Sequence, residues 1–254
     1  MEPIEIDRDG TRLHALWQQG TGTPLVIVPG VLADAKSWRR AAAAIDRPEP
    51  ILVVNRRGRE PSGPLGDDYG VDTEVLDLFA WLHHLKEPVR LFGWSFGGLI
   101  AIETANRTRS VDRVIAYEPI MRPFGAHALP ALRAAEGDPD RILDVALRDI
   151  AGTPPEQVPA PARELLRTWA APVPQETAAL NMFAPAWEDL TAPVDLIVGE
   201  NSRNTPYGDT FDAVASLLPA AGLHVLKGQG HLAHAEDPEA LGATITGLIA
   251  ARAA

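Results

Sequence analysis

The sequence of 254 residues contains no cysteine. Disulfide frameworks, thiol nucleophiles and cysteine metal sites are therefore excluded, because each of them requires the missing sulfur atom. Lys and Arg are also few, 23 against 34 Asp and Glu, and the net charge is −11. Nucleic-acid and anionic-membrane surfaces need clustered cations. We therefore expect no nucleic-acid or membrane partner, and expect a small organic molecule as the substrate.

Long hydrophobic runs are missing as well. The longest apolar stretch, residues 24–33, is interrupted by Pro29 and Gly30 and is far shorter than the roughly 20 residues of a membrane-spanning helix. The chain opens on acidic residues, whereas a secretory signal opens on a basic region and an apolar run. These patterns favour a cytoplasmic protein, and we expect a monomer or a homodimer.

Short apolar runs alternate with helical patterns along much of the chain. The runs have the character of parallel strands buried on both faces, and they are residues 25–28, 51–54, 89–92, 114–117 and 194–198. Residues 71–85 carry an apolar stripe of period 3.6, with Asp72, Glu74 and Asp77 on or near the polar side. An alternating pattern around Asp9-Gly10 predicts a β-hairpin before them. The sequence therefore predicts an α/β fold, a mostly parallel twisted sheet with helices on both faces.

The alternation stops after Tyr117 and resumes at Val194. The residues between show only helical patterns, for example Asp138 and Pro139 in the positions of an N-cap and a first helical turn. We expect three or four helices there, forming a cap over the carboxyl edge of the sheet, where open α/β sheets bind their ligands. The predicted α/β core comprises residues 1–119 and 189–254, and the inserted helical cap comprises residues 120–188.

The segment GWSFG, residues 93–97, follows a buried run and precedes a helix-like pattern. A G-x-S-x-G sequence in a strand–turn–helix setting is typical of a nucleophile elbow. The turn forces its serine into a strained backbone conformation, and side chains two residues to either side would collide with the strand or the helix. Ser95 is therefore the candidate nucleophile, and the alternative is a glycine-rich packing turn.

A serine nucleophile needs a base, and His231 is the best placed of the seven histidines. It follows a predicted strand at residues 223–226 and precedes the last predicted helix, so its imidazole emerges at the carboxyl edge where Ser95 opens. Its position after Ser95 also fits the chain order of such sites. His234 is the alternative base, and a metal site made by His231 and His234 lacks a third ligand.

An oxyanion hole needs two backbone N–H groups that point at the carbonyl oxygen of the substrate. One belongs to the residue after the nucleophile, Phe96. The second comes from the loop after the first parallel strand, residues 28–34, and we assign it to Val31. The alternative for this loop is a plain strand-to-helix turn.

Together these segments resemble the α/β-hydrolase fold superfamily, serine hydrolases with a helical cap. The resemblance covers essentially the full length, through VPGVLADAKSW (28–38), NRRGREPSG (55–63), GWSFGG (93–98), YEPI (117–120) and GQGHLAH (228–234). It implies a triad of Ser95, His231 and a carboxylate, with no metal or cofactor. Such families commonly show His where this chain has Pro29 and Asp where it has Asn55. The resemblance also implies a structural role for three arginines, Arg56, Arg57 and Arg59.

The acid of the triad is not where the resemblance predicts it. Families of this fold carry an Asp three residues beyond the position of Gly199, and this chain has Ser202 there. Some members instead place the acid after the strand that follows the nucleophile helix, where this chain has Glu118. We favour Glu118 as the residue that orients His231. Alternatives are Glu200, Asp209, and a dyad supported by Asn or Ser.

The function expected from these residues is hydrolysis of an ester, lactone or thioester of a small, largely apolar compound. Amides and carbon–carbon bonds are cleaved by the same groups and stay open. The alternative is a non-hydrolytic member of the fold, a ligand receptor or a cyclase-type protein, which the unusual acid position motivates. Candidate pocket residues are Trp94, Met121, Phe124, Trp169, Met182, Phe183 and Trp187.

Overall fold

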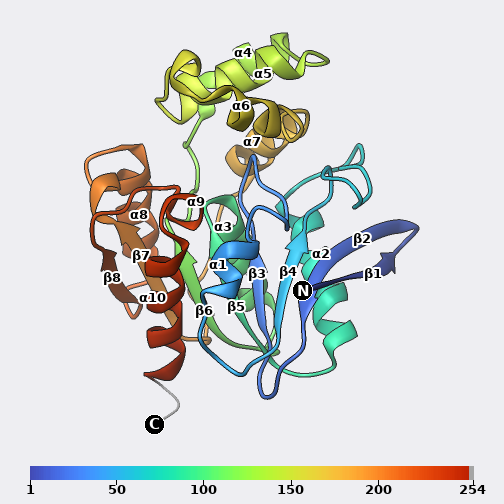
Figure 1. Ribbon diagram of the computed structural model, residues 1–254, viewed down its shortest axis with the longest axis vertical. Coiled ribbons are helices and arrows are strands. Elements are labelled where there is room, and N and C mark those ends of the chain that lie inside the picture. Colours follow the sequence, from blue (N-terminus) through green and yellow to red (C-terminus); the bar gives the residue numbers. More distant parts are fainter. Residues whose placement is uncertain (252–254) are drawn as a thin grey trace.

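The computed structural model describes residues 1–251 and shows an eight-stranded sheet with the strand order β1-β2-β4-β3-β5-β6-β7-β8 (Figure 1). The strands β1 and β2 form an antiparallel hairpin, β2 pairs antiparallel with β4, and all later pairs are parallel. The mostly parallel sheet predicted from the sequence is confirmed. The strands are β1 (Glu2–Arg8), β2 (Thr11–Gln18), β3 (Leu25–Val28), β4 (Ile51–Asn55), β5 (Val89–Trp94), β6 (Val111–Tyr117), β7 (Val194–Gly199) and β8 (Gly222–Leu226).

The hairpin turn and the strand registers follow from local sequence. Asp9 and Gly10 have φ angles of 53° and 79°, the pair of positive values that a two-residue type I′ turn requires. At the other end of the sheet, Trp94 of β5 pairs with Tyr117 of β6, and Tyr117 pairs with Ile197 of β7. Because β5 and β6 end at the same level, the residue after each strand lies at the same edge of the sheet.

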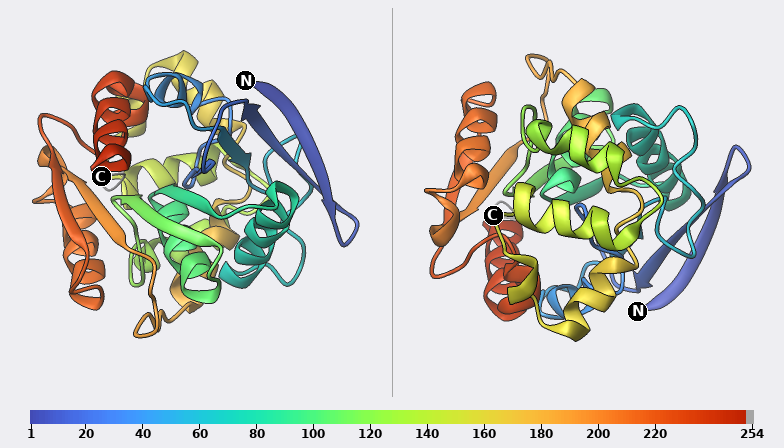
Figure 2. Two further views of the ribbon diagram at one scale, coloured as in Figure 1. Left: turned by 90° about the horizontal axis from the view of Figure 1, so that it is seen from below. Right: turned by 90° about the horizontal axis from the view of Figure 1, so that it is seen from above.

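Helices cover both faces of the sheet, as predicted from the sequence (Figure 2, left). One apolar cluster joins the sheet to α2 (Val71–Leu85), α3 (Phe96–Arg107) and α8 (Pro206–Leu217). A second cluster joins the opposite face to α1 (Arg39–Ala43), α9 (Ala233–Glu236) and α10 (Pro238–Ala250). The apolar stripe predicted for residues 71–85 faces the core, but Glu74 and Asp77 are buried and not on a solvated side. Their charge is matched by buried arginines, which the helical pattern alone does not reveal.

The regular structure between β6 and β7 is entirely helical, and we call residues 120–193 the helical insert. Its helices are α4 (Leu129–Ala134), α5 (Pro139–Val145), α6 (Ala160–Arg167) and α7 (Val173–Met182). Asp138 caps α5 as predicted, because its carboxylate accepts the Arg141 N–H at 3.1 Å. The insert has a small apolar cluster of its own and lies beyond the carboxyl ends of the strands (Figure 1). No helix in residues 1–251 is long and apolar enough to cross a membrane.

Candidate active site

Ser95 occupies a strained turn between β5 and α3. Its φ and ψ angles are 57° and −124°, outside the regions that residues with a Cβ ordinarily adopt. A Cβ added to Gly93 would lie 2.3 Å from the Gly97 carbonyl oxygen, and one added to Gly97 would lie 2.1 Å from the Val28 carbonyl oxygen. The geometry expected of a nucleophile elbow is therefore present, and it raises Ser95 at the carboxyl edge of the sheet.

Glu118 follows β6 and contacts His231. Its Oε2 lies 2.6 Å from Nδ1 of His231, and its Oε1 accepts the Gly199 N–H at 2.8 Å. The side chain of Glu118 is fully buried, and that of His231 is 12% exposed. Glu118 has a φ angle of 43°, which costs about 1–3 kcal/mol and is retained where the surroundings fix the chain. Its own N–H donates to the Ile197 carbonyl at 2.8 Å, so the backbone of Glu118 is held as well as its carboxylate.

The other acids considered from the sequence lie elsewhere. Glu200 Oε2 accepts the Gly228 N–H at 2.8 Å and supports that loop. Asp209 is exposed on the first turn of α8. Ser202, at the position where the family resemblance predicts an acid, is buried beside these residues. Among residues 1–251, Glu118 is the carboxylate in hydrogen-bond contact with His231.

The loop that carries His231 is fixed by aromatic residues. The Trp94 indole donates to the His231 carbonyl at 2.8 Å, and the Tyr117 hydroxyl donates to the Gly230 carbonyl. The Tyr207 ring stacks on the imidazole, with ring centroids 3.7 Å apart and planes 19° apart.

The Ser95 hydroxyl and His231 share no hydrogen bond in the described chain, and such bonds commonly tighten only when substrate is bound.

His234, the alternative base, is buried and turned away from this contact. Its ring stacks on Trp38 at 4.6 Å and packs on Trp94 at 4.3 Å. Burial, and secondly the proximity of His231, lower the pKa of His234 to about 3. A ring that stays neutral across physiological pH and stacks between indoles is a packing residue. The structure therefore brings His231, and not His234, to Glu118.

We expect His234 to make the protein less stable in acid. The pKa of His234 is depressed in the folded state, so protons bind preferentially to the unfolded chain below the unperturbed pKa of about 6.5. The stabilisation is present above that pH and is lost as the pH falls towards 3. Between pH 7.5 and 5 this linkage lowers the free energy of unfolding by about 2 kcal/mol. Urea titrations of His234→Phe should show a correspondingly flatter pH dependence, and a dependence as steep as in the wild type would refute the assignment.

The two candidate oxyanion donors belong to Phe96, the residue after Ser95, and to Val31, in the loop that packs on the elbow. The Phe96 and Val31 N–H groups form no hydrogen bonds within residues 1–251, so both are free to receive a ligand oxygen. Phe96 is the first residue of α3, where the positive end of the helix dipole adds to the donor strength. The loop of Val31 packs tightly on the elbow, because a Cβ on Gly30 would lie 2.8 Å from Ser95 Cβ.

A buried ion-pair network that the sequence did not predict contacts the oxyanion loop, the name we give to residues 28–34, at the Gly30 carbonyl. Arg56 contacts Glu74 at 2.8 Å and Glu176 at 2.6 Å, and Arg59 binds the same Glu176 through two N–H groups at 2.5 and 2.8 Å. Burial works against the charge of Arg56, but the carboxylates of Glu176 and Glu74 raise its pKa on balance. The arginines following β4 are thus structural, as the family resemblance implies. The sequence shows acidic residues at Glu74 in α2 and Glu176 in α7, but it does not show that they pair with these arginines, because the fold brings them together.

The candidate pocket residues differ in their surroundings. Phe124 packs on Tyr207, with ring centroids 5.1 Å apart, and partly buried Met121 and Phe183 belong to the same apolar cluster as Phe96. The Trp94 ring contacts the His231 ring, with centroids 4.9 Å apart. Trp187 is buried and its indole donates to Glu103 of α3 at 2.8 Å, so we interpret it as a core residue. Met182 is 84% exposed and therefore lines no enclosed pocket, and Trp169 is buried.

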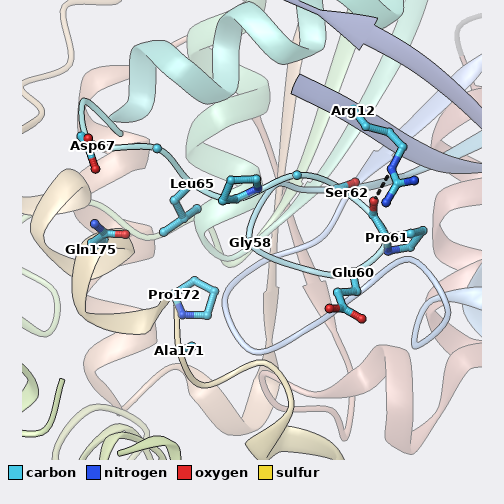
Figure 3. A pocket seen from close by; sticks show the side chains of 13 residues that line it. Arg12, Gly58, Glu60, Pro61, Ser62, Leu65, Asp67, Ala171, Pro172 and Gln175 are labelled. Carbon is cyan, nitrogen blue, oxygen red and sulfur yellow. Dashed lines mark hydrogen bonds between the residues drawn. The ribbon is translucent and has the colours of Figure 1, made fainter. Parts of the chain in front are cut away.

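A separate groove lies between the loop after β4 and the start of α7 (Figure 3). Its volume is about 870 Å³, and its rim includes Arg12, Glu60, Asp67 and Gln175. Arg12 is already engaged there, because its Nε donates to the Pro61 carbonyl at 2.8 Å. None of the residues that line it is Ser95, Glu118 or His231.

In residues 1–251 no group of three or more His, Asp or Glu could hold a metal ion.

Comparisons with known proteins agree with this architecture. A model described as "Alpha/beta hydrolase family" matches residues 25–244. N-formylmaleamate deformylase from Pseudomonas putida is 30% identical over 129 residues, which are 50% of this chain and 48% of that protein, about half of its length. (E)-2-((N-methylformamido)methylene)succinate hydrolase from Acinetobacter baylyi is 22% identical over 249 residues, 92% of this chain and 93% of that protein. A solved alpha/beta hydrolase from Sphaerobacter thermophilus is 22% identical, with a TM-score of 0.79 over 97% of this chain and 100% of that chain.

Proposed function

Because this chain belongs to the alpha/beta hydrolase family, we propose that it is a serine hydrolase whose catalytic residues are Ser95, His231 and Glu118. The observation that carries the proposal is the Glu118–His231 contact of 2.6 Å beside a serine in an elbow conformation. The hydrolases among its relatives support the general activity. The core of residues 1–119 and 189–254 supplies the catalytic groups, and residues 120–188 form a cap that shapes the substrate pocket.

The reaction proceeds through an acyl-enzyme. Ser95 Oγ attacks the substrate carbonyl carbon while His231 Nε2 takes the hydroxyl proton, because Nδ1 is held by Glu118. The negative charge on the carbonyl oxygen is stabilised by the N–H groups of Val31 and Phe96. The imidazolium returns its proton to the leaving group, whose bond to the carbonyl carbon breaks. Water then attacks the acyl carbon with His231 as base, and Ser95 regains its proton.

We propose an ester, lactone or thioester of a small, largely apolar compound as the substrate. The apolar residues near the imidazole, Tyr207 and Phe124, favour such a compound. Both curated relatives are named for formyl amides, and the same atoms cleave an amide. A panel of p-nitrophenyl acyl esters of graded length, lactones, thioesters and N-formyl amides therefore distinguishes these classes, and the highest kcat/KM identifies the bond type.

Covalent labelling tests the proposed function directly. We expect a fluorophosphonate probe to modify the folded protein once, with peptide mapping placing the adduct on Ser95. Ser95→Ala should abolish labelling, while Ser202→Ala, which changes a buried serine at the same edge, should retain it. A folded wild type that stays unlabelled and inactive on the whole panel would contradict a hydrolase. It would favour a ligand receptor or cyclase-type protein, which needs no activated serine.

A further inference from the structure

We propose that Arg56 is a positioning residue that fixes both backbone donors of the oxyanion hole and connects them to the helical insert. The proposal rests on the proposed function, because the two N–H groups matter only if an oxyanion forms between them. Arg56 is the first residue after β4, and its side chain is 2% exposed. Because its side chain is buried, we assign it no contact with the reacting atoms, and it acts through the groups that it holds.

The first contact is to the peptide that carries the Val31 donor. One Arg56 N–H donates to the Gly30 carbonyl oxygen at 2.8 Å. That carbonyl and the Val31 N–H belong to one planar peptide group and point in opposite directions. A charged donor on the oxygen therefore fixes the direction of the N–H on the other side. It also polarises the peptide, which strengthens the N–H as a donor.

The second contact is to the residue that carries the other donor. The guanidinium carbon of Arg56 lies 5.2 Å from the centroid of the Phe96 ring, within the range of a cation–π interaction. The ring is fully buried, so this contact packs the first turn of α3 against the arginine. A single planar side chain thus touches both the Gly30–Val31 peptide and Phe96, the two segments that carry the donors.

The third contact joins the arginine to the helical insert. Glu176 of α7 is fully buried and lies 2.6 Å from the Arg56 guanidinium. Arg59 secures the same carboxylate with two N–H groups and donates to the Ala33 carbonyl at 3.2 Å. Separating α7 from the core would remove the carboxylate partner of Arg59 and leave Arg56 with Glu74 alone, which is strongly unfavourable for buried charges. Seating of the insert therefore stabilises the arginine that holds the two donors.

The test compares Arg56 with its neighbour Arg57. Arg57 is buried to a similar extent and forms a two-point ion pair with Asp77 at 2.6 and 2.7 Å, but it contacts neither oxyanion segment. On the best substrate of the panel, we expect Arg56→Met to lower kcat about 100-fold with little change in KM, the scale of a roughly 1 Å misplacement. Arg57→Met should lose stability yet keep a kcat close to the wild type.

A trifluoromethyl ketone adds a readout that a purely structural role would not change. Its adduct with Ser95 places an oxyanion between the donors, so its affinity for Arg56→Met should fall in parallel with kcat/KM. If the methionine variant does not fold, Arg56→Lys takes its place in the same measurements. A lysine keeps the charge but, as a single ammonium, cannot hold the Gly30 carbonyl and both carboxylates as the planar fork does. Its kcat should also fall, whereas Arg57→Lys should not.

The outcomes separate this inference from the proposed function. A wild type that is neither labelled nor active refutes both. A wild type that is labelled and active, with Arg56 and Arg57 variants alike in kcat, KM and ketone affinity, overturns the role of Arg56 and leaves the hydrolase intact. A loss of kcat and ketone affinity confined to the folded Arg56 variants supports the inference.

Discussion

Glu118→Gln is expected to lower kcat about 10⁴-fold, the loss seen when the acid of a Ser–His–Asp site is neutralised without changing its shape. Glu118 accepts the Gly199 N–H with one oxygen and faces His231 Nδ1 with the other. A glutamine that keeps its oxygen on Gly199 turns its NH₂ group towards Nδ1. The imidazole is then held with its proton on Nε2, the atom that must accept the Ser95 proton.

Steady-state kinetics with Glu200→Gln as the matched control checks this expectation. Glu200 occupies the loop where the fold usually keeps its acid, but its carboxylate supports the Gly228 N–H. Its substitution should leave kcat within a few-fold of the wild type, because no catalytic atom moves. The reverse pattern, a large loss in Glu200→Gln and a small one in Glu118→Gln, would assign the catalytic acid to Glu200.

Gly97→Ala is expected to destabilise the fold by about 3 kcal/mol or more, at the upper end of overpacking effects. Gly97 is in a helix, where alanine alone would be favoured by about 1 kcal/mol. The added Cβ, however, would lie 2.1 Å from the Val28 carbonyl oxygen and 2.6 Å from that of Pro29. These are backbone atoms of β3 and the oxyanion loop, which cannot rotate away as a side chain does, so the clash outweighs the helix preference.

Urea denaturation with Gly247→Ala as the control measures this effect. Gly247 lies in α10, and a Cβ there meets nothing within 4 Å. That variant should therefore gain about 0.4–1 kcal/mol, since helix propensity acts alone. Equal denaturation midpoints for Gly97→Ala and the wild type would mean that the elbow relaxes without cost.

The sequence predicts the elbow and the position of Glu118 because both depend on local order along the chain. A residue that follows a buried parallel strand lies at the carboxyl edge, wherever that strand sits in the sheet. Glu118 follows β6 and Ser95 follows β5, and these strands are neighbours. Their proximity thus follows from two strand ends and one rule of topology.

The buried ion pairs cannot be predicted from the sequence, because the fold brings their partners together. Arg56 and Glu176 are separated by 120 positions, and each looks like an ordinary surface charge in its own segment. Helical periodicity assigns Glu74 and Asp77 to the polar side of their helix. It separates apolar from polar residues but does not identify an internal salt bridge. Pocket residues show the same dependence on the fold: both Trp187 and Phe124 are aromatic residues of the insert, yet one bonds to Glu103 of α3 and the other packs on Tyr207.

The location of the acid after β6 also determines which parts of the chain must come together to build the site. The proposed nucleophile and the proposed acid lie in one contiguous strand–helix–strand unit, residues 89–118, whereas His231 follows the last strand, β8. During synthesis, the unit emerges from the ribosome before the histidine exists. A chain in which β8 has not docked on β7 lacks the proposed base beside Ser95. We therefore expect labelling of Ser95 to report when the C-terminal part of the fold has docked.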